Sequence, residues 1–153
     1  MEHPYSIDAG IRRDGRAVLI GAAVTVGGSL VATTVIGIAA ITGMLLRGAN
    51  PERIAAELPG SLALAIFVAL GGLLMSAAGG YTAAAMAQSR RYRHALAASI
   101  LATVATVALL PVWGESSTDW LTGLGTALIV PCGAVGAWLA MPVPVLTAAP
   151  QKR

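Results

Sequence analysis

Charged residues are scarce in this chain of 153 residues. Asp, Glu, Lys and Arg together make up 11% of it, whereas 56% of the residues are hydrophobic. Ordinary globular domains carry about 25% charged residues. A soluble chain this short has too little interior to bury so much apolar surface. The composition therefore excludes a soluble globular domain and favours a membrane protein.

Asp, Glu, Lys, Arg and His are absent from the four longest apolar runs of the sequence. Proton relays, ion coupling and metal sites inside a membrane need such groups at depth. The sequence also has no metal-ligand cluster, no phosphate-binding glycine-rich loop with its lysine and no nucleophile elbow. We therefore expect no enzymatic activity, no catalytic residues, no cofactor and no metal.

Cysteine is almost absent as well, because Cys132 is the single one. An intrachain disulfide is thereby excluded. Cys132 lies within an apolar run, and apolar surroundings disfavour the reactive thiolate. We interpret it as a small packing residue.

The four uncharged runs are long enough to cross a bilayer as helices, since a hydrocarbon core of about 30 Å needs about 20 residues. The first run is longer than this, and also longer than the core of a signal peptide, so we expect it to remain in the protein and to tilt or project. The sequence predicts an all-α membrane protein, an up-down bundle of four transmembrane helices. The predicted helices cover about 17–46, 61–87, 95–112 and 120–141.

Polar segments flank this predicted transmembrane domain, 17–141. In residues 1–16, Gly10 and Gly15 interrupt any helical pattern, which predicts a short, mobile cytoplasmic arm. Residues 142–153 are rich in proline and end in two basic residues. We interpret them as a cytoplasmic tail.

A short surface helix is predicted at about 51–58. Asn50 is a good N-cap, Pro51 suits the first helical position, and Glu52 lies where the helix dipole favours an anion. Pro59 ends the pattern. We expect this helix to lie on the outer surface with its apolar side chains facing the membrane.

Small residues recur every fourth position in the predicted helices, which places them on one face. Such faces allow close packing of helices in lipid. Because several of these residues carry hydroxyls, a polar track for a solute is the alternative interpretation. The residues predicted to pack helices together are Gly21, Ser29, Gly72, Ser76, Gly80 and Gly133.

The segment GGYTAAAMAQ, followed by the basic turn QSRRYRH, resembles a pattern in a family of small, mostly uncharacterised four-helix membrane proteins of bacteria. That pattern is GGY-x-A-x-x-x-A before a basic turn. The resemblance implies a similar bundle in a bacterial membrane. It implies no activity and no site residues.

Basic residues are distributed unevenly along the chain. The N-terminal arm, the central turn and the tail hold eight of the ten Lys and Arg, and the remaining two are Arg47 and Arg53. Positive loops face the cytoplasm, so we expect both termini on the cytoplasmic side of a bacterial inner membrane. Topology explains these charges better than nucleic-acid binding. The arginines expected at the cytoplasmic edge, where lipid headgroups lie, are Arg12, Arg13, Arg16, Arg90, Arg91 and Arg93.

Two further features concern the fourth predicted helix. Pro131 lies at its middle and removes a backbone hydrogen bond, which predicts a kink. GAVGAWLA at Gly133 resembles GYTAAAMA at Gly80, and RRYRHALAASIL before the third helix resembles RRDGRAVLIGAAV before the first. A duplication of two helices plus two is therefore one interpretation, and chance similarity between alanine-rich helices is the other.

Two functions are compatible with this sequence. The first is an accessory or scaffolding subunit that packs against a membrane-protein partner or another copy of itself. The alternative is a small transporter or channel subunit in which hydroxyls line a path for a solute. The hydroxyls in question belong to Thr25, Ser29, Thr33, Ser76, Thr103 and Thr126.

Overall fold

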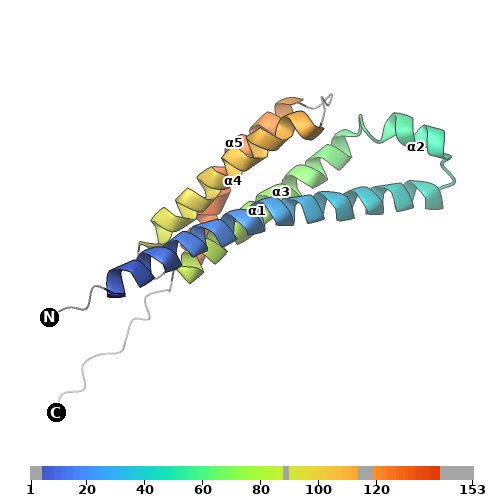
Figure 1. Ribbon diagram of the computed structural model, residues 1–153. Coiled ribbons are helices and arrows are strands. Elements are labelled where there is room, and N and C mark those ends of the chain that lie inside the picture. The colour runs from blue at the N-terminus through green and yellow to red at the C-terminus, as the bar shows by residue number, and fades with distance from the viewer. Residues whose placement is uncertain (1–4, 88–89, 114–118, 142–153) are drawn as a thin grey trace, which may run out of the picture.

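The computed structural model describes residues 5–87, 90–113 and 119–141, with the side chains of 14–87, 90–109 and 120–141. Within these ranges the chain is almost entirely helical and has no strand (Figure 1). The helices are α1 (Tyr5–Leu46), α2 (Pro51–Glu57), α3 (Leu62–Met86), α4 (Arg91–Trp113) and α5 (Asp119–Leu139).

Four of these helices, α1, α3, α4 and α5, are long and apolar enough to cross a membrane. The sequence-based prediction of four membrane-spanning helices is thus confirmed in the length and composition of the helices. Among the described side chains of α1, the candidate span is Asp14–Leu46. The ends of α3 and α5 agree with the prediction to within two residues.

The start of α1 differs from the prediction, because the helix begins at Tyr5 and continues unbroken past Gly10 and Gly15. The expectation of an irregular segment before residue 17 is wrong from Tyr5 onward. Each glycine costs a helix about 1 kcal/mol relative to alanine. Extending a helix that already exists nevertheless needs no new nucleus and adds a hydrogen bond per residue.

The start of α4 also lies earlier than predicted, at Arg91 instead of 95. Arg90, just before it, has a φ of 45°, in the left-handed region that non-glycine residues seldom adopt. Its carbonyl accepts a hydrogen bond from the amide of Arg93 at 2.8 Å. The basic residues Arg91 and Arg93 therefore belong to the first turn of α4.

The short helix predicted at 51–58 is confirmed as α2. The Asn50 side chain accepts a hydrogen bond from the amide of Arg53 at 2.8 Å, and Ile54 is buried. Arg53 donates to Glu57 at 2.7 Å on the exposed side. This hydrogen bond raises the pKa of the Arg53 guanidinium, and the negative charge of Glu57 raises it further.

Helix α3 is central to the packing, since it contacts α1, α4 and α5, while α4 contacts α1 and α5. Figure 1 shows the helices converging near the start of α1 and separating toward α2. The converging end is held by a cluster of buried alanines. These are Ala83 and Ala84 of α3, Ala95 and Ala98 of α4, and Ala137 of α5.

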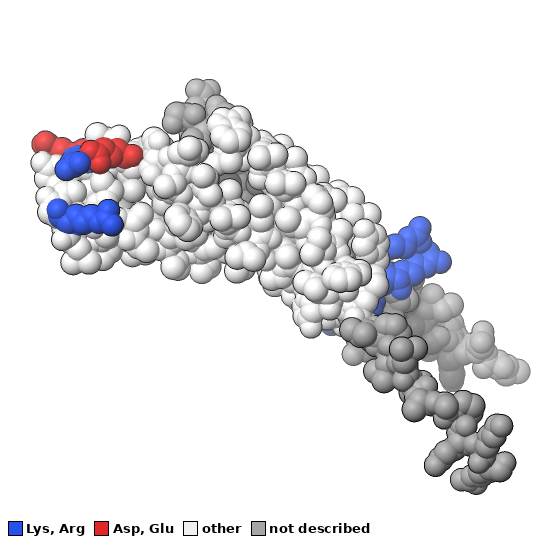
Figure 2. Space-filling model, turned by 180° about the vertical axis from the view of Figure 1, so that it is seen from behind, with Lys and Arg blue, Asp and Glu red and all other residues white. Residues whose placement is uncertain are grey.

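The core consists almost entirely of small side chains. Ser76 and Ser99 are the largest side chains that are fully buried among the described residues, whereas many leucines, isoleucines and valines are exposed. In water this arrangement would be unfavourable, but in lipid small interfaces allow close helix packing. Figure 2 agrees with a membrane environment, since charged residues lie at the two ends of the visible face and the surface between them is uncharged.

Candidate functional site

The closest approach of α3 and α5 is made by backbone atoms. A Cβ atom added to Gly80 would lie 2.7 Å from the Cα and carbonyl carbon of Gly133. One added to Gly136 would lie 2.7 Å from the carbonyl carbon of Ala77 and 2.9 Å from the amide nitrogen of Tyr81. Only hydrogen fits at these positions, so the glycines set how closely α3 and α5 approach.

A second close contact joins α1 to α3. A Cβ atom added to Gly21 would lie 2.8 Å from the carbonyl oxygen of Gly79 and 2.7 Å from the Cβ of Ala83. One added to Gly79 would meet Thr25 Oγ1 and would lie 2.5 Å from the Gly21 carbonyl oxygen. The contacts of α3 with α1 and with α5 therefore both depend on glycines, and these glycines lie at the same level of the bundle.

The predicted packing residues thus occupy two different environments. Gly21, Gly80 and Gly133 lie at the close contacts. A Cβ atom on Gly72, in contrast, would have only Ser29 Oγ nearby, at 3.8 Å. The sequence pattern did not single out Gly136 for packing, although glycine spacing around Gly133 was the available signal.

A cavity of about 510 Å³ begins where the helices separate. It is bounded by α1, α3, α4, α5 and the connection between α2 and α3, and most of its wall is apolar. Gly72 and Gly125 contribute no side chains to the wall, which enlarges the space. The hydroxyl-bearing residues in the wall are Thr25, Ser29, Thr33, Thr34, Ser61, Ser76, Thr106, Thr122 and Thr126.

Most of these hydroxyl groups already use their hydrogen atoms. Six of the nine donate to the carbonyl four residues earlier in their own helix, as Ser and Thr residues in membrane helices commonly do. The cavity therefore offers oxygen lone pairs but few donors. The bonded pairs are Thr25 to Gly21 (3.1 Å), Ser29 to Thr25 (2.6 Å), Thr34 to Leu30 (2.9 Å), Ser76 to Gly72 (2.8 Å), Thr106 to Ala102 (2.9 Å) and Thr126 to Thr122 (2.8 Å).

The inner limit of the cavity is formed by buried residues. Thr25 is 3% exposed, Ser76 is 1% exposed and Ile129 is 8% exposed. The glycine contacts and the alanine cluster follow directly beyond them. Thr103, which the sequence grouped with the path-lining hydroxyls, is not part of the wall and donates to the Ser99 carbonyl at 2.9 Å.

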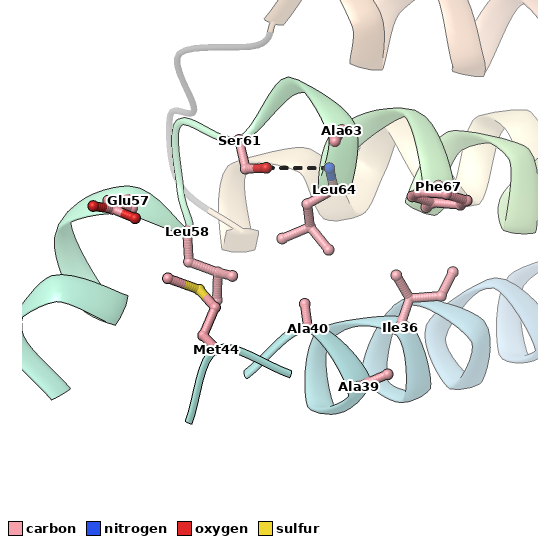
Figure 3. Close-up of a pocket in the computed structure, with 10 residues that line it drawn as sticks. All are labelled: Ile36, Ala39, Ala40, Met44, Glu57, Leu58, Ser61, Ala63, Leu64 and Phe67. Atoms are coloured by element: carbon pink, nitrogen blue, oxygen red, sulfur yellow. Dashed lines mark hydrogen bonds between the residues drawn. The ribbon is translucent and has the colours of Figure 1, made fainter. Parts of the chain in front are cut away.

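A second cavity, of about 670 Å³, lies between α1 and α3 next to α2. Figure 3 shows its apolar side chains, among them Ile36, Met44 and Phe67, with Glu57 at one end. The Ser61 hydroxyl oxygen accepts a hydrogen bond from the Leu64 amide at 3.3 Å and caps the first turn of α3. Both cavities thus adjoin the start of that helix.

At the converging end, His94 links two helices. Its Nε2 lies 3.5 Å from Oδ2 of Asp14 on α1, and its Nδ1 lies 3.2 Å from the Arg90 carbonyl oxygen. The two side chains are only 20% and 21% exposed. Sequence reasoning found no carboxylate for His94 in its own turn and missed Asp14, because the partner comes from a helix about 80 positions away.

Four of the described arginines lie at the same end. Arg16, Arg90, Arg91 and Arg93 are exposed there, while the side chains of Arg12 and Arg13 lie outside the described residues. Figure 2 shows basic residues at both ends of the visible face and acidic residues only at the α2 end. The α2 end carries Arg47, Glu52, Arg53 and Glu57.

Pro131 lies inside α5 and is exposed. The residue whose carbonyl it leaves without a partner, Ala127, is exposed on the same helix. The kink itself stays a prediction. Cys132, next to it, is half-buried and free.

No three His, Cys, Asp or Glu side chains gather around a common point within the described part of the chain. Comparison with protein-family models, with curated proteins and with solved structures gives no match.

Proposed function

We propose that this protein is an accessory or scaffolding subunit of a bacterial inner membrane, without catalytic activity or cofactor. It acts by packing against a membrane-protein partner or against further copies of itself. The observation that carries the proposal is the composition of the core. Glycine and alanine hold the helices together at one end, and no ionisable side chain lines the central cavity.

Our proposal includes an up-down order of the four long helices. Supporting it, the alanine cluster joins the end of α3, the start of α4 and the end of α5, and Val18 near the start of α1 packs against it. Helices that alternate in direction bring these segments to one end. The basic residues at this end favour a cytoplasmic location for both termini.

The proposed duplication is supported by the contact between Gly80 and Gly133. These glycines occupy matching positions in the two similar sequence segments. Counterpart residues meet one another on a two-fold axis, and repeats of two helices share an axis along the membrane normal. The structure departs from full symmetry, since α3 contacts α4 but the counterpart pair, α1 and α5, makes no comparable contact within the described residues.

The accessory role is tested by isolating the protein in a mild detergent and measuring the mass of the particle by light scattering. In parallel, proteins are cross-linked in native membranes before purification. We expect an oligomer, or a stoichiometric membrane-protein partner. A monomer that also recovers no partner from native membranes would contradict the proposal.

A small transporter or channel subunit is the second candidate, and the hydroxyl-lined cavity is the observation that favours it. We test it in sealed vesicles by measuring the entry of a neutral solute such as glycerol by stopped-flow light scattering. Entry above that of protein-free vesicles, lost when the cavity is filled by Gly125→Leu, would establish a path. The accessory role predicts no such difference.

A further inference from the structure

We propose that the central cavity between α1, α3, α4 and α5 is a binding site for one acyl chain of a membrane lipid. Its volume of about 510 Å³ falls within the range of about 300–1,000 Å³ seen for small-molecule sites. The wall is mainly apolar and contains no Asp, Glu, Lys, Arg or His. An uncharged, elongated ligand matches this wall.

The hydrogen bonds that the wall hydroxyls already make favour hydrocarbon over water as the occupant of the cavity. A buried water molecule is held by about two to four hydrogen bonds. Six of the nine hydroxyls in the wall donate to their own helix instead. The inner part of the cavity, near Ser76 and Ile129, consequently has no donor to offer, and hydrocarbon is the better occupant there.

A helix from a second copy is too wide for this space. An α-helix with its side chains is roughly 10 Å across, so about 510 Å³ holds little more than one turn of it. An acyl chain is narrower, because it carries no side chains, and extends further into the same volume. The shape of the space therefore favours a lipid chain over a partner helix.

The residues between α4 and α5 are equally unsuited to the cavity. Residues 114–118 read GESST and have no large apolar side chain. The outer part of the wall, at Pro59, Ser61 and Leu121, adjoins the exposed Trp120. Tryptophan is typical of the membrane–water interface. A lipid can therefore insert one acyl chain there while its headgroup stays among the headgroups of the bilayer.

Two glycines of α5 provide a matched test. Gly125 lines the cavity, whereas Gly123 is exposed outside it, and an added Cβ has no neighbour within 4 Å at either position. We compare wild type, Gly125→Leu and Gly123→Leu by native mass spectrometry. Each is purified in dodecyl maltoside supplemented with phosphatidylethanolamine and phosphatidylglycerol that carry 16- and 18-carbon chains.

We expect wild type and Gly123→Leu to retain one lipid per chain, and Gly125→Leu to retain at least five-fold less. Gly72→Leu fills the same cavity from α3 and serves as the second variant where Gly125→Leu fails to fold. A wild type free of lipid, or equal retention in the filled and control variants, overturns the proposal. The spectra also report oligomers, so loss of an oligomer without loss of lipid overturns the lipid site and leaves the accessory role intact.

Discussion

Gly80 of α3 and Gly133 of α5 touch through their backbones, with no room for a Cβ atom between them. A contact between main chains cannot adapt by a change of rotamer. Any side chain at Gly80 must push the two helices apart. Because α3 also contacts α1 and α4, such a displacement affects the whole bundle.

Replacing Gly80 by leucine should lower the thermal stability of the detergent-solubilised protein. Overpacking costs about 1–3 kcal/mol, and the contact with rigid backbone places this change at the upper end. The control is Gly27→Leu on α1, because Gly27 is exposed and has no neighbour within 4 Å of an added Cβ. Leucine should be neutral or slightly stabilising there, because glycine is a poor helix former. An unchanged or raised melting temperature for Gly80→Leu would show that α3 and α5 do not meet at this face.

The contact between Gly133 and Ser99 should behave differently, because a side chain is involved. An added Cβ at Gly133 would meet Ser99 Oγ and would lie 3.0 Å from Ser99 Cβ. Gly133→Ala should therefore destabilise the protein, and Ser99→Ala should restore part of the loss. Coupling energies of contacting residues are about 0.5–3 kcal/mol, and a double-mutant cycle of melting temperatures and unfolding free energies measures this one.

The matched cycle pairs Gly79→Ala with Ser99→Ala. Gly79 faces Thr25 and Gly21 on α1, so these two changes should add within about 0.5 kcal/mol. Equal coupling in both cycles would mean that the effects spread through the bundle and do not arise at the α4–α5 contact.

The Asp14–His94 contact should stabilise the association of α1 with α4. A cycle of Asp14→Ala and His94→Ala should give a favourable coupling of about 1 kcal/mol, at the upper end of values for exposed pairs, because both side chains are largely buried. The Arg53–Glu57 pair on α2, which is 66% and 52% exposed, serves as the comparison and should couple more weakly. A coupling at Asp14–His94 no larger than at α2 would contradict a specific link between the helices.

Orientation can be tested with single cysteines in a Cys132→Ser background. Asn50→Cys reports the α2 end, and Tyr92→Cys reports the basic end without removing an arginine; both positions are exposed. A membrane-impermeant maleimide should label position 50 in intact cells. Position 92 should be labelled only after the membrane is permeabilised. The reverse pattern would invert the proposed topology.

Local sequence signals were sufficient for the elements of this fold. Uncharged runs predicted the four long helices, and Asn50, Pro51 and Pro59 predicted α2. The start of α1 was missed because cooperative extension of a long helix outweighs the local effect of glycine.

The candidate site was much less predictable. Gly72 and Gly80 belong to the same series of small residues, which recur at every fourth position of α3. Nevertheless Gly72 lines the cavity, whereas Gly80 touches α5. Periodicity identifies the face of a helix, but the level at which two helices cross depends on the partner helix. For the same reason the pairing of His94 with Asp14 was not visible in the sequence.

The unequal lengths of the helices have a consequence for the surrounding bilayer. Asp14 of α1 and His94 of α4 lie at one level, and from there α4 continues about 28 Å to Trp113, whereas α1 continues about 48 Å to Leu46, at 1.5 Å per residue. A hydrocarbon core of about 30 Å matches α4. The longer α1 must tilt or extend beyond it, and a thicker bilayer requires less tilt. Membrane thickness therefore biases the angle at which α1 and α4 diverge, and with it the width of the cavity between them.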